Sequence, residues 1–256
     1  MDLGLKDKVA LVTGSSRGIG RSIALGLAEE GCNVSLCARG ETTLRQTESE
    51  VSAKGVRTVA TAVDMMQAGG VQQVVQNTLE EFGRIDILIN NVGGSKWTPF
   101  GDVADEEWNE IFDMNLWAAV RATRSVLPTM KEQGSGVVVT ISSIFGRESG
   151  GPVTYNATKA AEISMAKTLA KELAPDGIRV NSIAPGSIIF PGGNWQKRLD
   201  DDPEGIGNFV KQEIPWGRFG TPEEVANVVV FVASDRASWV TGACINVDGC
   251  QSRSLI

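Results

Sequence analysis

Short runs of β-branched and other apolar residues alternate along this chain with longer segments of helical periodicity. Strands are predicted at residues 9–13, 33–37, 58–62, 85–90, 137–141, 179–183 and 243–247. Helices are predicted near 18–30, 41–53, 68–82, 105–131, 154–173 and 222–233. This alternation is typical of βαβ units, whose strands form a parallel sheet with helices on both faces. The sequence therefore predicts an α/β fold with a doubly wound parallel sheet of about seven strands.

No change of composition, long linker or internal repeat divides the 256 residues, so we expect one domain that spans residues 1–256. The segment 190–215 departs from the alternation, because it combines glycines, prolines and acidic residues with scattered apolar ones. A connection of this length is predicted to be a substrate loop or lid. A disordered surface insertion is the alternative.

Charge and composition exclude several classes of function. The net charge of −7 and the pI near 4.8 argue against a nucleic-acid partner. No apolar run approaches the ~20 residues that a membrane span needs, and no signal peptide is evident at the N-terminus, so a cytoplasmic protein is predicted. The four cysteines lack Cys-x-x-Cys spacing and are predicted to be small buried groups in a reducing compartment.

The chain contains no histidine and a single tyrosine, Tyr155. The absence of histidine excludes most catalytic triads and the usual zinc sites, and no metal site is predicted. Lys159 follows Tyr155 by four residues, which puts both side chains on one face of a helix. An ammonium group beside a phenol favours the phenolate, so the two residues could transfer a proton. On spacing alone, an aromatic residue beside a solvated lysine is the simpler interpretation.

Three glycines, Gly14, Gly18 and Gly20, follow the first predicted strand and open the first predicted helix. Glycines at such a turn let the backbone approach a pyrophosphate and point helix N-terminal amides at it. A purely steric need for glycine is the alternative. The strand before the turn and the amphipathic helix after it favour a Rossmann-like dinucleotide site.

The end of the second predicted strand bears on the choice of cofactor. An NAD site would place an acid there to hold the ribose 2′-hydroxyl, but this strand ends in Ala38-Arg39. Arg39, together with Arg17 in the glycine turn, could bind a 2′-phosphate. We therefore predict NADP(H) rather than NAD(H), unless Glu41 occupies the discriminating position.

With these motifs the chain resembles the short-chain dehydrogenase/reductase family, in its single-domain branch, over nearly its whole length. The resemblance rests on short motifs in family order: the glycine turn, Asp64, Asn90-Asn91-Val92-Gly93, Asn115, Ser143, Tyr155 with Lys159, Pro185-Gly186 and Asp248-Gly249. Val92, Phe190 and Cys250 depart from the family pattern, and Phe190 replaces a threonine that often contacts the nicotinamide carboxamide.

The resemblance implies hydride transfer between a nicotinamide and a carbonyl carbon, with Tyr155 as general acid or base and Lys159 assisting it. It implies that Ser143 donates a hydrogen bond to the carbonyl oxygen, although Ser142 is an alternative, and that Asn115 holds a water beside Lys159. Capping of a strand end by Ser143, or a helix irregularity at Asn115, would be the structural alternatives. The implied cofactor-binding residues are Gly14, Ser16, Arg17, Gly18, Ile19, Gly20, Arg39, Asp64, Met65, Asn91, Val92, Gly93, Tyr155, Lys159, Pro185, Gly186 and Ile188.

Residues 217–224 make the 3-oxoacyl reductases the most similar branch, which implies a 3-oxoacyl-like or other small ketone as substrate. Residues 132–134 and 175–177 lack the arginines with which carrier-protein reductases dock an acidic carrier, so a coenzyme A thioester or a sugar-like, steroid-like or other free ketone stays open. Apolar candidates for the pocket are Trp97, Phe145, Trp195 and Trp216, unless they pack the lid itself. Arg147 could meet an anionic substrate group, pair with Glu148 or point to water.

Two further expectations concern partners. Segments 116–127 and 160–173 carry more apolar residues than the one stripe that each helix would bury against the sheet. The remaining apolar surface predicts a homo-oligomer, either a tetramer or a dimer, in which residues 250–256 form a second contact. A non-catalytic NADP-sensing or scaffold protein could share the fold. Such relatives typically lose the tyrosine or the lysine, and this chain keeps both.

Overall fold

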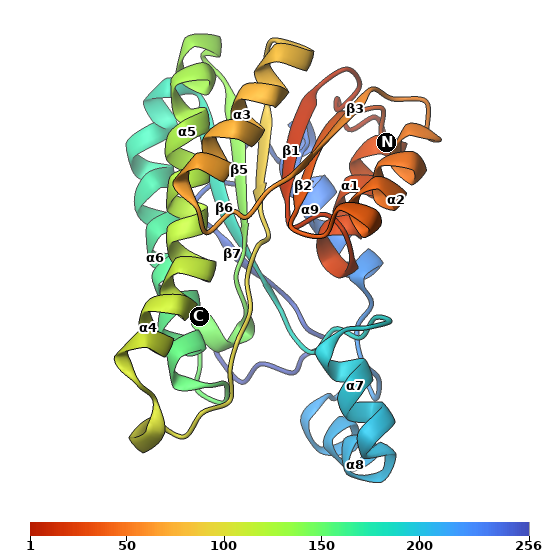
Figure 1. The fold of residues 1–256 in the computed structure, drawn as a ribbon, viewed down its shortest axis with the longest axis vertical. Coiled ribbons are helices and arrows are strands. Elements are labelled where there is room, and N and C mark those ends of the chain that lie inside the picture. Colours follow the sequence, from red (N-terminus) through yellow and green to blue (C-terminus); the bar gives the residue numbers. More distant parts are fainter. Residues whose placement is uncertain (256) are drawn as a thin grey trace.

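Seven parallel strands form the single sheet of this protein (Figure 1). The computed structural model describes residues 1–255. The strands are β1 (Val9–Thr13), β2 (Asn33–Ala38), β3 (Thr58–Ala62), β4 (Ile87–Asn90), β5 (Gly136–Ile141), β6 (Ile178–Pro185) and β7 (Cys244–Val247). Their order across the sheet is β3-β2-β1-β4-β5-β6-β7. The predicted doubly wound α/β fold is confirmed.

Helices cover both faces of the sheet (Figure 1). One face carries α1 (Gly18–Glu29), α2 (Glu41–Ser52) and α9 (Pro222–Ala233). The other carries α3 (Ala68–Phe82), α5 (Ala118–Gln133) and α6 (Val153–Leu173). Each layer buries its own apolar cluster against the sheet. Central strands are therefore enclosed on both sides, and all five residues of β1 are buried, as the apolar run of its first four residues predicts.

The prediction of one continuous helix over residues 105–131 is wrong. The segment consists of α4 (Asp105–Phe112), a π-helical turn (Asp113–Trp117) and α5. The amide nitrogen Nδ2 of Asn115 donates to the carbonyl oxygen of Ile111 at 2.8 Å. Because that carbonyl would otherwise accept from the backbone of Asn115, the side chain competes with the regular helical bond and widens the turn.

The segment 190–215, predicted as a loop or lid, is mostly helical. It forms α7 (Asn194–Asp201) and α8 (Pro203–Glu213), which extend beyond the carboxyl edge of the sheet (Figure 1). Asp202 caps α8 by accepting from the amide of Gly205 at 2.9 Å, and Pro203 occupies the first turn. Trp195 stacks on Phe209 with ring centroids 4.7 Å apart. An internal cap and an aromatic contact thus order a segment whose composition suggested a loop.

The cysteines correct a second expectation. Cys32 and Cys37 are buried, and burial raises the pKa of both thiols to about 12. Cys250 is instead exposed and has φ of 66°, in the left-handed region that favours glycine. The chain thus places a side chain where a glycine would fit with less strain.

Two observations concern partners. Within residues 1–255, no helix is long and apolar enough to cross a membrane. In the same range no group of three or more His, Cys, Asp and Glu side chains could hold a metal ion. Ile256, the last residue of the expected C-terminal contact, lies outside the described residues.

Candidate active site

The glycine turn lies at the carboxyl end of β1, where the chain enters α1. Gly14 and Gly18 have φ of 65° and 54°, which glycine adopts without strain. A Cβ on Gly20 would overlap the carbonyl oxygen of Gly14 and the side-chain nitrogen of Asn91. The three glycines therefore give a turn that no larger side chain could form.

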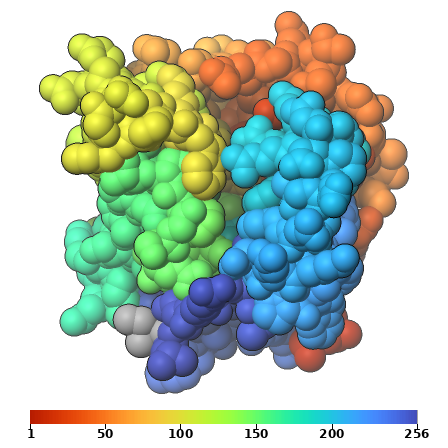
Figure 2. All heavy atoms as spheres, turned by 90° about the horizontal axis from the view of Figure 1, so that it is seen from below, coloured from red at the N-terminus to blue at the C-terminus, as the bar shows by residue number. Residues whose placement is uncertain are grey.

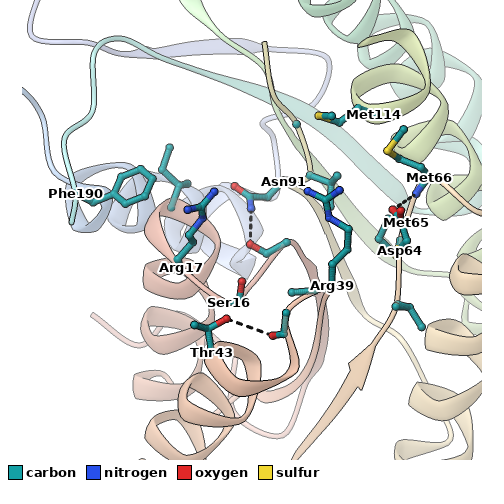
Figure 3. A pocket seen from close by; sticks show the side chains of 17 residues that line it. Ser16, Arg17, Arg39, Thr43, Asp64, Met65, Met66, Asn91, Met114 and Phe190 are labelled. Carbon is teal, nitrogen blue, oxygen red and sulfur yellow. Dashed lines mark hydrogen bonds between the residues drawn. The ribbon is translucent and has the colours of Figure 1, made fainter. Parts of the chain in front are cut away.

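The residues after β4 fasten this turn. Asn91 donates through Nδ2 to the carbonyl oxygens of Thr13 and Gly14 at 3.0 and 3.1 Å (Figure 3). The backbone amides of Asn91 and Val92 donate to the hydroxyl of Thr13 at 2.9 and 3.3 Å. These bonds connect the carboxyl ends of β1 and β4.

A first cavity of about 510 Å³ lies at the carboxyl ends of β1 and β4. It is lined by Gly14, Ser16, Arg17, Ile19, Ala38, Arg39, Gly40, Thr43, Val63, Asp64, Met65, Met66, Asn91, Val92, Gly93, Met114 and Phe190. Most residues predicted to bind the cofactor are therefore brought together here. Gly40, Thr43, Val63, Met66 and Met114 also line the cavity, but they carry no recognisable motif and the sequence predicted none of them.

Two arginines give one end of the first cavity a positive charge. Arg17 and Arg39 extend into it from the glycine turn and from the end of β2 (Figure 3). Within residues 1–255, Arg39 makes no hydrogen bond or ion pair, whereas Nη1 of Arg17 donates to the carbonyl oxygen of Gly192 at 3.4 Å. Glu41 does not line the cavity and lies 3.6 Å from Arg45. No carboxylate therefore competes with the arginines at the end of β2.

A second cavity of about 500 Å³ adjoins the first. Arg17, Gly93 and Phe190 line both cavities, so the two share a wall. In Figure 2 a hollow separates the yellow segment near residue 100 from the cyan segment that contains α7. The lining is Arg17, Gly93, Ser95, Trp97, Ser143, Ile144, Phe145, Pro152, Tyr155, Gly186, Ser187, Ile188, Phe190, Gly193, Asn194, Trp195, Lys197, Arg198 and Asp201.

Tyr155 and Ser143 both face the second cavity. Ser143 follows β5, and its hydroxyl oxygen accepts from the amide of Phe145 at 3.1 Å. The hydroxyl therefore also caps the turn at the end of this strand, which was the structural alternative to a catalytic role. The neighbouring Ser142 is buried and donates to the carbonyl oxygen of Lys159 at 2.9 Å. Of the two serines, only Ser143 is in a position to contact a molecule in this cavity.

Lys159 and Asn115 lie directly beneath the junction of the cavities. A Cβ on Gly93 would come within 3.3 Å of Lys159 Nζ and 2.7 Å of Asn115 Oδ1. Lys159 Nζ lies 5.5 Å from the centroid of the Tyr155 ring. Burial disfavours the ammonium, but the Glu162 carboxylate and then Tyr155 outweigh it, so the pKa of Lys159 is raised. The lysine is held as a cation next to the phenol.

Several residues predicted for the site do not line the two cavities. Gly18, Gly20, Lys159 and Pro185 line neither cavity, although Gly186 and Ile188 line the second. Trp216 lines a third cavity of about 330 Å³. Arg147 donates to the carbonyl oxygen of Cys244 at 2.9 Å and to Asn246 Oδ1 at 2.8 Å, so it bonds to β7, does not line the second cavity and does not pair with Glu148.

The charged and polar residues of α7 carry no motif by which the sequence could predict them. Arg198 lies 5.0 Å from the ring centroid of Trp97 and 5.2 Å from that of Trp195, and all three side chains line the second cavity. Lys197, Asn194 and Asp201 also line it. A loop prediction for 190–215 gave no helical face from which to select these side chains.

Comparisons with known proteins agree with this geometry. The family model described as enoyl-(acyl carrier protein) reductase matches residues 14–250. The 3-oxoacyl-[acyl-carrier-protein] reductase FabG of Staphylococcus epidermidis is 39% identical over 245 residues, 95% of this chain and 98% of that protein. These matches place the chain in the short-chain dehydrogenase/reductase family, so it is an oxidoreductase of that family.

Two solved structures have the same fold over the full chain. L-sorbose reductase from Gluconobacter frateurii, complexed with NADPH and L-sorbose, has a TM-score of 0.95 and 37% identity, with 100% of both chains covered. A 7α-hydroxysteroid dehydrogenase complexed with NADH and 7-oxo glycochenodeoxycholic acid has a TM-score of 0.91 and 28% identity, covering 100% of this chain and 98% of its own. Similar frameworks thus hold either dinucleotide.

Replacing Gly20 by alanine tests the close approach at the turn. The added methyl group has no room, so Gly20→Ala should lower the free energy of unfolding by about 1–3 kcal/mol, as overpacking does. Gly207 in α8 is the matched control, because a methyl group added there would meet no heavy atom of another segment within 4 Å. Gly207→Ala should raise stability by about 0.5–1 kcal/mol. Denaturant titration gives both values, and equal effects would contradict the assigned packing.

Proposed function

We propose that this chain is an NADP(H)-dependent reductase that interconverts a ketone and a secondary alcohol. The observation that carries the proposal is the meeting of Tyr155, Lys159 and Ser143 where two adjoining cavities share a wall. The first cavity has the shape and donors for a dinucleotide: a turn with three glycines, helix N-terminal amides and two arginines. The second has room for a small carbonyl compound.

In the proposed mechanism the protein handles the proton and the developing charge. The nicotinamide, when bound, supplies the hydride during reduction and accepts it during oxidation. Tyr155 gives its phenolic proton to the carbonyl oxygen, and Ser143 donates a hydrogen bond to the same oxygen. The Lys159 ammonium stabilises the phenolate that forms. Asn115 lies near Lys159 beside Gly93, where it would hold a water next to the lysine, and its Oδ1 accepts from the amide of Gly94 at 3.1 Å.

The preference for NADP(H) rests on Arg17 and Arg39. Both can make charge-assisted bonds to a 2′-phosphate, and the end of β2 has no carboxylate to hold a 2′-hydroxyl instead. The NADPH complex of the L-sorbose reductase supports this choice. The NADH complex of the steroid dehydrogenase indicates that the fold alone does not decide it.

For the substrate we propose a 3-oxoacyl-like or other small ketone, supported by the FabG relative. The polar lining of the second cavity favours a polyhydroxy ketone as a second candidate, because Ser95, Ser187 and Asn194 could bind hydroxyl groups. The L-sorbose complex of the solved relative supports this alternative. NADPH consumption with acetoacetyl-coenzyme A, L-sorbose and a steroid ketone distinguishes the classes.

Tyr155→Phe removes only the phenolic oxygen and should abolish turnover of every ketone in that panel. NADPH binding, measured by fluorescence, should persist because Tyr155 lines the second cavity and not the first. Full activity of the variant would contradict the proposed proton donor. Failure of the unmodified protein to use NADPH with any ketone would contradict the proposed reaction.

Arg39→Ala should weaken NADPH binding by about 10- to 100-fold, the equivalent of a lost charge-assisted bond to phosphate. NADH binding should barely change, because NADH lacks that phosphate. Arg45→Ala is the matched control, since Arg45 pairs with Glu41 and Glu48 and lines neither cavity. Calorimetric titrations of both dinucleotides test this, and tighter binding of NADH by the unmodified protein would refute the role of the two arginines.

We also propose a homo-oligomer, a tetramer or otherwise a dimer. Trp117 is 45% exposed, and Leu116, Val120, Ile163 and Leu169 are only half-buried, so these helices keep apolar surface uncovered. Light scattering should therefore give at least twice the chain mass of 27.2 kDa. A single active species of chain mass would refute the assembly.

A further inference from the structure

Behind Tyr155 and Lys159 lies a carboxylate to which the proposed mechanism assigns no role. Glu162 follows Lys159 by three residues on α6, and both its oxygens lie 3.0 Å from Lys159 Nζ. The side chains of Lys159 and Glu162 are 3% and 1% exposed. A carboxylate is rarely buried to this extent, because removing an ion from water is unfavourable unless the ion is well paired.

The contacts of Lys159 use every proton of its ammonium group. Nζ donates to the two oxygens of Glu162 and to the carbonyl oxygen of Ile141 at 2.9 Å. An ammonium has three donors and no acceptor, so these three bonds fix its orientation. Glu162 and the end of β5 thus hold the nitrogen beneath Gly93, within reach of both cavities.

No other charge in the described chain competes with this pair. The charges that act on Lys159 are those of Glu162 and Tyr155, and Lys159 is the charge that acts on Glu162. β5 carries no ionisable residue. The remaining charges on packed elements have partners of their own or are exposed. Arg179 on β6 bonds to carbonyl groups, and Arg147 and Glu148 after β5 bond to β7 and to the C-terminal segment. On α4, Glu107 and Glu110 bond to Thr98 and Lys96, and Asp105 and Glu106 are exposed to solvent. Asp113 in the π-helical turn pairs with Arg121.

We propose that Glu162 is a positioning residue of the active site, whose carboxylate anchors the Lys159 ammonium and sets the pH range over which the Tyr155–Lys159 pair keeps its proton. The inference rests on the proposed reductase mechanism. A negative charge beside the pair favours its protonated form, whichever member loses the proton first. Burial raises the pKa of Glu162 itself, so the experiment must also establish that Glu162 is charged.

Glu162→Gln keeps the shape of the side chain and removes its charge. Ketone reduction needs a protonated Tyr155, so the rate falls at high pH, on the high-pH limb of the pH–rate profile. In Glu162→Gln this limb should move to lower pH by about 1 unit or more, the usual effect of losing an opposite charge at hydrogen-bonding distance. NADPH binding should persist, because Glu162 lines neither cavity. Glu162→Asp retains the charge and should restore the limb toward its original position.

Glu172→Gln is the matched control. Glu172 is an exposed residue of α6 about 15 Å farther along the helix axis than Glu162, so its removal should leave the limb unmoved. If the glutamine variant does not fold, Glu162→Leu provides a neutral apolar replacement. An unmoved limb in a folded neutral variant would mean that Glu162 carries no charge in the active protein, and would overturn the inference.

A second readout requires no substrate. Because Tyr155 is the only tyrosine of the chain, tyrosine labelled at the ring carbon Cζ gives one NMR resonance. Its first inflection with pH should occur at lower pH in Glu162→Gln than in the unmodified protein and in Glu172→Gln. If the unmodified protein reduces no ketone, the proposed function fails while this titration still decides the role of Glu162. If it is active and neither readout moves, only the inference fails.

Discussion

The pairing of β1 with β4 is the constraint on which the rest of the site depends. Ala10 lies opposite Ile87 and Val12 opposite Ile89, although β1 and β4 are far apart in sequence. The chain leaves β1 toward one face of the sheet and β4 toward the other, so the carboxyl edge between them stays uncovered (Figure 1). Ligands in doubly wound sheets bind at such a switch point. Both cavities, the glycine turn and the buried lysine are arranged around this edge.

Buried polar side chains position the site from below. Asn91 donates to the carbonyl oxygen of Gly14 in the glycine turn. Asn115 donates to the carbonyl oxygens of Ile111 and Gly94, and Ser142 donates to that of Lys159. Each uses its side chain to satisfy a backbone group, which offsets the cost of burying the polar atoms. Asn91 also lines the first cavity, whereas Asn115 and Ser142 line neither and act only on the backbone that surrounds the site. Glu162 likewise lies behind the cavities and belongs to this supporting layer.

The sequence predicted the parts of the molecule that follow from local patterns. Apolar runs such as residues 9–12 and the glycines that follow them require no knowledge of distant residues, and they indicated the sheet and the first cavity. The π-helical turn at Asn115 depends on a side chain that competes with a backbone bond, and the order of 190–215 depends on the contact of Trp195 with Phe209. Two signals in the sequence could have predicted more: Asp202-Pro203 is typical of a helix start, and the three-residue spacing of Lys159 and Glu162 is typical of an ion pair on one helix face.

Residues 190–193 connect the two cavities to the glycine turn. Phe190 lies against Gly18 and lines both cavities, and the carbonyl oxygen of Gly192 accepts from Arg17. The same short segment therefore borders the space proposed for the dinucleotide and the space proposed for the ketone. A movement of this segment would change both spaces at once, so the two ligands would not bind independently of each other.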